Sequence, residues 1–149
     1  MPHSNYVGDF YGWTNEQAAL LRAGKFAIAD IEHIAEEIES LGGSEKRELV
    51  NCLSVLLLRL VKWRFQPKRR GAGWEASIRV QRLNLARHLK ANPSLKAKLP
   101  EATAVAYAWA VNEAAAETGL ALSKFPDNCP WSFDEIMRSD FPPSDPACR

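Results

Sequence analysis

Hydrophobic residues recur at helical spacing along most of the chain, and no segment alternates hydrophobic and polar residues long enough to predict a β-strand. The clearest example is a helix expected over residues 30–41, capped by Asp30 and ended by Gly42-Gly43. Intervals of three, four and three residues give this helix one apolar face, made of Ile31, Ile34, Ile38 and Leu41. Its other faces carry glutamates.

A second helix is expected over about residues 45–65, beginning after Ser44. Its middle, residues 53–61, is apolar on nearly every side and is interrupted only by Ser54 and Arg59. A helix that is apolar all round is normally surrounded by other helices, so this segment is predicted to be the centre of the fold. Pro67 ends it, because proline disfavours helical dihedrals in the residue before it.

Four further helical segments follow from caps and periodicity. A capping box at Thr14–Gln17 predicts a helix over about 15–23, ended by Gly24, and a second box at Ser132–Glu135 predicts one over 133–138. A helix over about 74–91 has Trp74, Ile78, Leu85 and Leu89 on one face. Between 95 and 118, Pro100 either kinks a helix or begins one, and the residues expected inward are Ala102, Val105, Ala106 and Trp109.

The predicted fold class is therefore all-α, a single-domain bundle of five to six helices around the central hydrophobic helix at about residues 45–65. We expect one domain over residues 1–141 and a C-terminal tail over 142–149. The length of 149 residues and the 46% of hydrophobic residues suffice for a core without a disulfide or a metal. The three cysteines, Cys52, Cys129 and Cys148, fit neither a disulfide framework nor a zinc site.

No targeting segment or membrane span is apparent in the sequence, so the expected compartment is the cytoplasm and no membrane partner is expected.

The net charge of +1 hides an asymmetry, because residues 59–98 carry twelve bases and one acid while both flanking regions are acidic. Such a basic segment is typical of a nucleic-acid interface. The alternative, which we favour, is that acidic and basic segments neutralise each other inside the bundle.

Several short segments, taken in order, resemble a bacterial family known as domain of unknown function 29. They are residues 9–13, 17–24, 36–42, 60–67, 74–78 and 117–120, followed by Phe125-Pro126 and Cys129-Pro130. The resemblance covers about residues 5–141 and implies a shared fold, but it brings no activity with it. The family pattern often has histidine where this chain has Arg59, so a role for that histidine would not carry over.

One candidate site is a polar cluster on the central helix. Charged Arg59 and Lys62 need partners there, because an unpaired buried charge costs several kcal/mol. The neighbouring acidic helix offers Glu36 and Glu37 as partners, and either Arg79 or Arg82 is expected to join them. This cluster is interpreted either as an ion-pair network that specifies the fold, which is favoured, or as the lining of a ligand pocket.

Two other candidates lie in the basic segment. Arg82 and His88 resemble the Arg-x4–6-His signature of the helical HEPN ribonucleases, in which arginine and histidine stabilise and protonate a phosphate. Lys68, Arg69 and Arg70 form a loop that is a candidate nucleic-acid contact. A metal site is not expected, since the acidic helix pairs His33 with Glu37 but no second ligand set exists.

The predicted function is a non-enzymatic helical module that binds a protein partner or forms a homodimer, without a cofactor. The alternative is an RNA-cleaving or nucleic-acid-binding domain that uses the basic segment 59–98.

Overall fold

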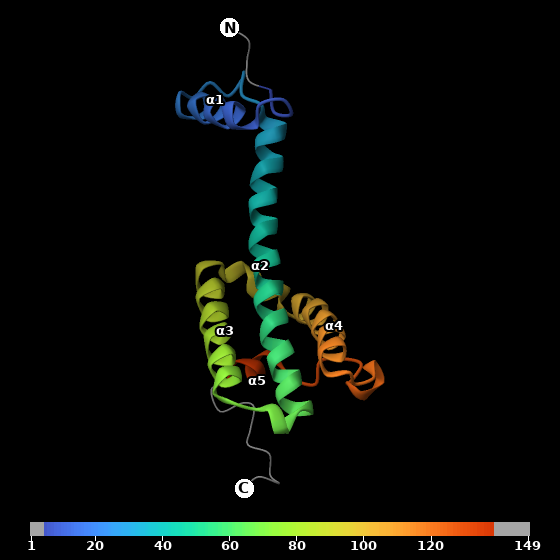
Figure 1. The fold of residues 1–149 in the computed structure, drawn as a ribbon. Coiled ribbons are helices and arrows are strands. Elements are labelled where there is room, and N and C mark those ends of the chain that lie inside the picture. The colour runs from blue at the N-terminus through green and yellow to red at the C-terminus, as the bar shows by residue number, and fades with distance from the viewer. Residues whose placement is uncertain (1–4, 139–149) are drawn as a thin grey trace. The chain divides into compact units, whose positions relative to one another are not determined.

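The computed structural model describes residues 5–138, and over these residues it is all-α (Figure 1). The helices are α1 (Phe10–Arg22), α2 (Ile31–Phe65), α3 (Ala72–Ala91), α4 (Leu99–Thr118) and α5 (Phe133–Met137). Short 3-10 turns lie at Pro67–Arg69, Pro93–Lys98 and Leu122–Lys124. The predicted all-α helical bundle is confirmed, and the predicted tail at 142–149 lies outside the described residues. The chain divides into two compact units, one up to Ser44 (the N-terminal unit) and one from Glu45 onward (the C-terminal unit).

The two helices expected at 30–41 and 45–65 are one continuous helix, α2, so the predicted break at Gly42-Gly43 is wrong. A glycine weakens a helix by about 1 kcal/mol relative to alanine, but it ends one mainly when it adopts a positive φ. Among the described residues only Gly24 and Gly119 do so, with φ of 73° and 74°. Ser44 is not a cap, because its hydroxyl donates to the carbonyl of Ser40 within the helix at 3.2 Å.

In the N-terminal unit, α1 begins five residues earlier than the capping box at Thr14 predicts. The side chain of Asp9 is the N-cap and accepts a hydrogen bond from the Gly12 amide at 3.1 Å. The Thr14 hydroxyl instead donates to the Tyr11 carbonyl at 2.7 Å, inside the helix. The expected end is confirmed, since α1 ends at Arg22, Ala23 is its C-cap, and Gly24 takes the left-handed conformation after it.

The core of the C-terminal unit is built around residues 49–61 of α2, as predicted for the central helix, and α3 and α4 flank this segment in Figure 1. Leu53, Leu56, Leu57 and Leu60 are fully buried. The predicted face of α3 is confirmed, because Ile78, Leu85 and Leu89 are buried and Trp74 is partly buried. Cys52 is buried in the same core.

Helix α4 begins with Pro100 in its first turn, which confirms the second of the two alternatives for this proline. Its buried face, however, is a row of alanines at intervals of four, Ala102, Ala106, Ala110 and Ala114, together with Tyr107 and Val111. Small side chains at this spacing allow neighbouring helices to approach closely. The prediction that Val105 and Trp109 point inward is wrong, since they are 55% and 45% exposed.

After Gly119 the chain packs back against the core of the same unit. The Tyr107 hydroxyl donates to the Pro126 carbonyl at 2.6 Å, and the ring of Phe125 meets that of Phe65 edge-on at 5.0 Å. The capping box at the start of α5 is confirmed in both of its bonds, from the Glu135 amide to Ser132 and from the Ser132 amide to Glu135. No helix in the described part of the chain combines the length and apolar character needed to cross a membrane.

Candidate functional site

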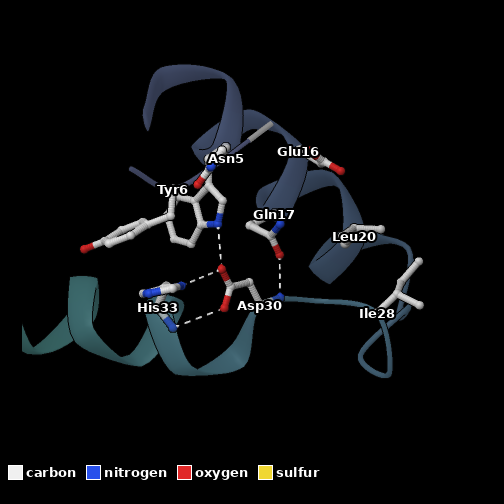
Figure 2. Close-up of a pocket in the computed structure, with 9 residues that line it drawn as sticks. Asn5, Tyr6, Glu16, Gln17, Leu20, Ile28, Asp30 and His33 are labelled. Carbon is white, nitrogen blue, oxygen red and sulfur yellow. Dashed lines mark hydrogen bonds and ion pairs between the residues drawn. The ribbon is translucent and has the colours of Figure 1, made fainter. Parts of the chain in front are cut away.

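A polar cluster joins α1 to the first turn of α2 within the N-terminal unit (Figure 2). At its centre is Asp30, whose carboxylate accepts a hydrogen bond from the Trp13 indole at 3.0 Å and lies 2.7 Å from Nδ1 of His33. The His33 amide donates to the other carboxylate oxygen at 3.4 Å, so Asp30 caps α2 as the sequence predicted. Buried Gln17 accepts from the Asp30 amide at 2.7 Å. Four hydrogen bonds thus converge on one residue.

Tyr6 completes this cluster from the segment before α1. Its ring stacks on the His33 ring, with centroids 4.1 Å apart and planes inclined by 15°, and it meets the Trp13 ring edge-on at 4.8 Å. The Tyr6 hydroxyl donates to the carboxylate of Glu37 on α2. Side chains from the segment before α1, from α1 and from α2 therefore hold the first turns of α2 in place.

Hydrogen bonds and charges within the cluster shift the pKa values of Asp30, His33 and Tyr6. The hydrogen bond from His33 lowers the pKa of Asp30 below its usual 3.8, and the same bond raises the pKa of His33 above 6.5. Glu36 and Glu32 act on His33 in the same direction. The hydrogen bond to Glu37 raises the pKa of Tyr6 to about 12, so its hydroxyl remains a donor across the physiological range.

A pocket of about 380 Å³ opens beside this cluster, lined by Asn5, Tyr6, Trp13, Glu16, Gln17, Leu20, Ile28, Asp30 and His33. An aspartate–histidine pair is the arrangement that activates a nucleophile in hydrolases. Among the described residues that line the pocket there is no serine, cysteine, threonine or lysine for His33 to activate. Its two carboxylates, Glu16 and Asp30, also disfavour an anionic substrate. What the described bonds of the cluster do is hold the start of α2 in position.

The second notable feature of the N-terminal unit is the apolar face of α2, here called the apolar stripe and defined as Ile31, Ile34, Ile38 and Leu41. Three of its members are exposed, Ile31 by 51%, Ile38 by 63% and Leu41 by 68%, and Ile34 is partly buried. Exposed acids flank it, namely Glu32, Glu36 and Glu39. An acidic amphipathic helix thus presents its apolar face to solvent in the described chain.

The predicted polar cluster of Glu36, Glu37, Arg59, Lys62 and Arg79 is not brought together, and the prediction is corrected. Because α2 is continuous, Glu37 and Arg59 lie 22 positions apart on one helix, whereas side chains on a helix meet three or four positions apart.

Each basic member of that predicted cluster has different surroundings. Lys62 pairs with Glu117 of α4 at 2.6 Å, and its ammonium lies 5.1 Å from the Trp74 ring centroid. Arg79 is exposed. Arg59 is partly buried, and its Nε is buried without a hydrogen-bond partner among the described residues. Arg59 is therefore partly buried, but the expected ion pair is not formed among the described residues.

The predicted catalytic pair, Arg82 and His88, bonds to different elements. Arg82 Nε donates to the carbonyl of Ile136 in α5 at 2.8 Å. Nε2 of His88 lies 2.8 Å from the carbonyl oxygen of Glu45 and 3.7 Å from the carboxylate of the same residue in α2. These contacts connect α3 to its neighbours within the C-terminal unit and do not direct both side chains toward one substrate space.

The basic loop is only partly available to a ligand. Lys68 and Arg69 are exposed, but Arg70 donates to the Trp63 carbonyl at 2.7 Å and lies over the Trp63 ring at 5.3 Å. Trp74, four residues after Arg70, is partly buried, and the Lys62 ammonium lies over its ring. Within the described residues, no group of three potential metal-ligating side chains is present.

Sequence reasoning missed the cluster around Asp30. Asp30 and His33 are three positions apart at a helix start, which is a local signal for a cap, but nothing local indicates that Tyr6, Trp13 and Gln17 would join them.

Comparison with protein-family models shows that the chain belongs to the family described as domain of unknown function DUF29, whose model matches residues 5–142. Searches of curated proteins and of solved structures found no match.

Proposed function

We propose that this member of the DUF29 family is a protein-binding module whose docking surface is the apolar stripe of α2. The observation that carries the proposal is the exposure of Ile31, Ile38 and Leu41 by half or more, at regular helical spacing. Contiguous exposed apolar residues rimmed by polar ones are characteristic of interaction sites. The helix that bears them is held by the hydrogen bonds around Asp30, so the surface is organised before a partner arrives.

Covering the stripe is energetically significant. Fully burying one Ile or Leu side chain contributes about 1.5–3 kcal/mol, so burying the exposed parts of Ile31, Ile38 and Leu41 contributes roughly 3–5 kcal/mol. This is less than a complete interface provides, because association itself costs several kcal/mol. The partner must therefore add contacts beyond the stripe, and charge is the contribution that the sequence supplies.

The charges beside the stripe limit the class of partner. Residues 31–41 carry four glutamates and no base, and the whole unit up to Ser44 has a net charge of −5. Nucleic acids and anionic membrane surfaces are recognised by basic residues, so both are disfavoured at this surface. A polypeptide whose apolar residues are flanked by lysine or arginine complements it, and an amphipathic helix is the usual form of such a ligand.

Site-specific photocrosslinking tests this proposal. The photoreactive residue p-benzoylphenylalanine is introduced at Ile38 in the full chain, in cells of the source organism, and at exposed Asn128 as the matched control. We expect ultraviolet-dependent adducts with a polypeptide at position 38 and not at position 128. Absence of any polypeptide adduct at position 38 would refute the proposed docking surface.

A further inference from the structure

We infer that the partner of the apolar stripe is a second copy of this chain, which binds through the solvent-facing side of α3. This inference rests on the proposed function, because it names the occupant of the same surface. The side of α3 in question, here called the basic face, is defined as Arg79, Val80, Leu83, Arg87 and Lys90.

The basic face has the features that the stripe requires. The core side of α3 buries Ile78, Leu85 and Leu89, yet Val80 and Leu83 on another side of the helix are 49% and 61% exposed. The exposed cations Arg79, Arg87 and Lys90 lie beside them. The whole of α3 has a net charge of +3, with Glu75 as its single acid.

The two faces also share one spacing. Ile31, Ile34, Ile38 and Leu41 lie at offsets 0, 3, 7 and 10 along α2, and Val80, Leu83, Arg87 and Lys90 have the same offsets along α3. This is the alternation of three and four residues that keeps one seam of a helix facing a partner helix in a coiled coil. Two helices with this spacing can lie side by side over about three turns. On α3, Val80 and Leu83 supply the apolar positions of this seam, and Arg87 and Lys90 supply cations that can reach the glutamates beside the stripe.

Charge favours this pairing over the simpler alternative in which two stripes face each other. Stripe against stripe would place four glutamates of residues 31–41 opposite four more. Like charges in register across a helix interface disfavour that arrangement. Stripe against basic face instead brings a segment with charge −4 to a helix with charge +3. The acidic stripe of one copy is therefore complementary in charge to the basic face of another copy.

Each copy carries one apolar stripe and one basic face. The stripe of one copy contacts the basic face of the second, and the second returns the same contact, which is the two-fold arrangement that most homodimers adopt. Two equivalent contacts double the buried apolar surface.

The first experiment measures the oligomeric state of the full chain by analytical ultracentrifugation. The chain mass is 16.7 kDa, so the dimer is expected at about twice that value. Ile38→Asp should convert the dimer to a folded monomer, whereas Val105→Asp, at an equally exposed apolar position on α4, should leave it unchanged. Circular dichroism confirms that each variant is helical. A monomeric wild-type chain at 100 µM, or a dimer that survives Ile38→Asp, would overturn the inference.

The second experiment identifies which faces meet. One variant reverses the acids beside the stripe (Glu32→Lys with Glu36→Lys), and the other reverses the basic face (Arg87→Glu with Lys90→Glu). Each variant alone should dimerise at least tenfold more weakly, and an equimolar mixture of the two should recover dimers, because each new charge then meets its opposite. Lys96→Glu with Lys98→Glu, at exposed positions outside α3, is the control for net charge and should have no effect. A basic-face variant that dimerises normally would refute the role of α3.

The outcome separates this inference from the proposed function. Adducts at position 38 that contain only another protein would refute self-association and leave the protein-binding surface in place. Adducts of twice the chain mass that contain peptides of α3 support both.

Discussion

Replacing Gly42 by alanine tests the continuity of α2 through the glycine pair. The structure leaves Gly42 inside the helix, and a Cβ added there meets no heavy atom within 4 Å. The change therefore has no steric cost and removes only the conformational freedom that glycine loses on entering a helix. Since glycine in an exposed helix interior is less favourable than alanine by about 1 kcal/mol, Gly42→Ala should stabilise this part of α2 by that amount.

The matched control is Gly24→Ala. A Cβ at Gly24 also meets nothing within 4 Å, but its φ is +73°, a conformation that costs alanine about 1–2 kcal/mol. The same chemical change should therefore destabilise the end of α1, and backbone conformation alone determines the sign.

Amide hydrogen exchange followed by mass spectrometry measures both variants locally. A stabilisation of about 1 kcal/mol slows exchange about fivefold, and for Gly42→Ala we expect this in peptides that cover residues 38–48. For Gly24→Ala we expect faster exchange around residues 20–26. Faster exchange in Gly42→Ala would mean that the chain leaves the helical conformation at Gly42, and the description of α2 as one helix would then be refuted.

Three further predictions concern single side chains. The pair with Asp30 raises the pKa of His33, so the stability that protonated His33 contributes is complete below pH 6.5 and is lost as pH rises through the raised pKa. The pKa of Asp30 is lowered, so the stability that its carboxylate contributes is complete above pH 3.8 and is lost as pH falls through the lowered pKa. Asp30→Asn should therefore lower the His33 pKa toward 6.5 in an NMR titration, and an unchanged pKa would contradict this. Tyr107→Phe leaves the Pro126 carbonyl without its 2.6 Å bond and should cost about 1–3 kcal/mol in urea unfolding, whereas no loss would show that water replaces the hydroxyl. RNA should remain intact with the protein and with His88→Ala alike, and cleavage abolished by this substitution would establish the ribonuclease alternative.

The sequence by itself determined the helical class and most helix ends. Local chemistry decides these features: the Ser132–Glu135 capping box satisfies free amides within one turn, and Gly119 ends α4 because glycine readily adopts a positive φ. The apolar middle of residues 45–65 likewise identified the central helix, since only surrounding helices can cover an apolar surface on every side.

Tertiary structure decided where the helical faces point. The inner side of α4 is a row of four alanines with Tyr107 and Val111, whereas Val105 and Trp109 face solvent, because the alanine row allows other helices to approach closely. The apolar stripe was recognisable as a helix face, but its exposure depends on which elements pack nearby, and periodicity carries no information about that.

The candidate site shows the same division. Asp30 was identifiable as a cap because its partner amide lies three residues away. The stacking of Tyr6 on His33 and the indole bond of Trp13 join residues separated by 27 and 17 positions, and they form only when α1 and α2 are packed. The expected ion pair between Glu37 and Arg59 failed for a related reason. It required a turn at Gly42-Gly43, and glycine is compatible with both a turn and a continuing helix, so the hydrogen bonds of α2 determine the result rather than the residue type.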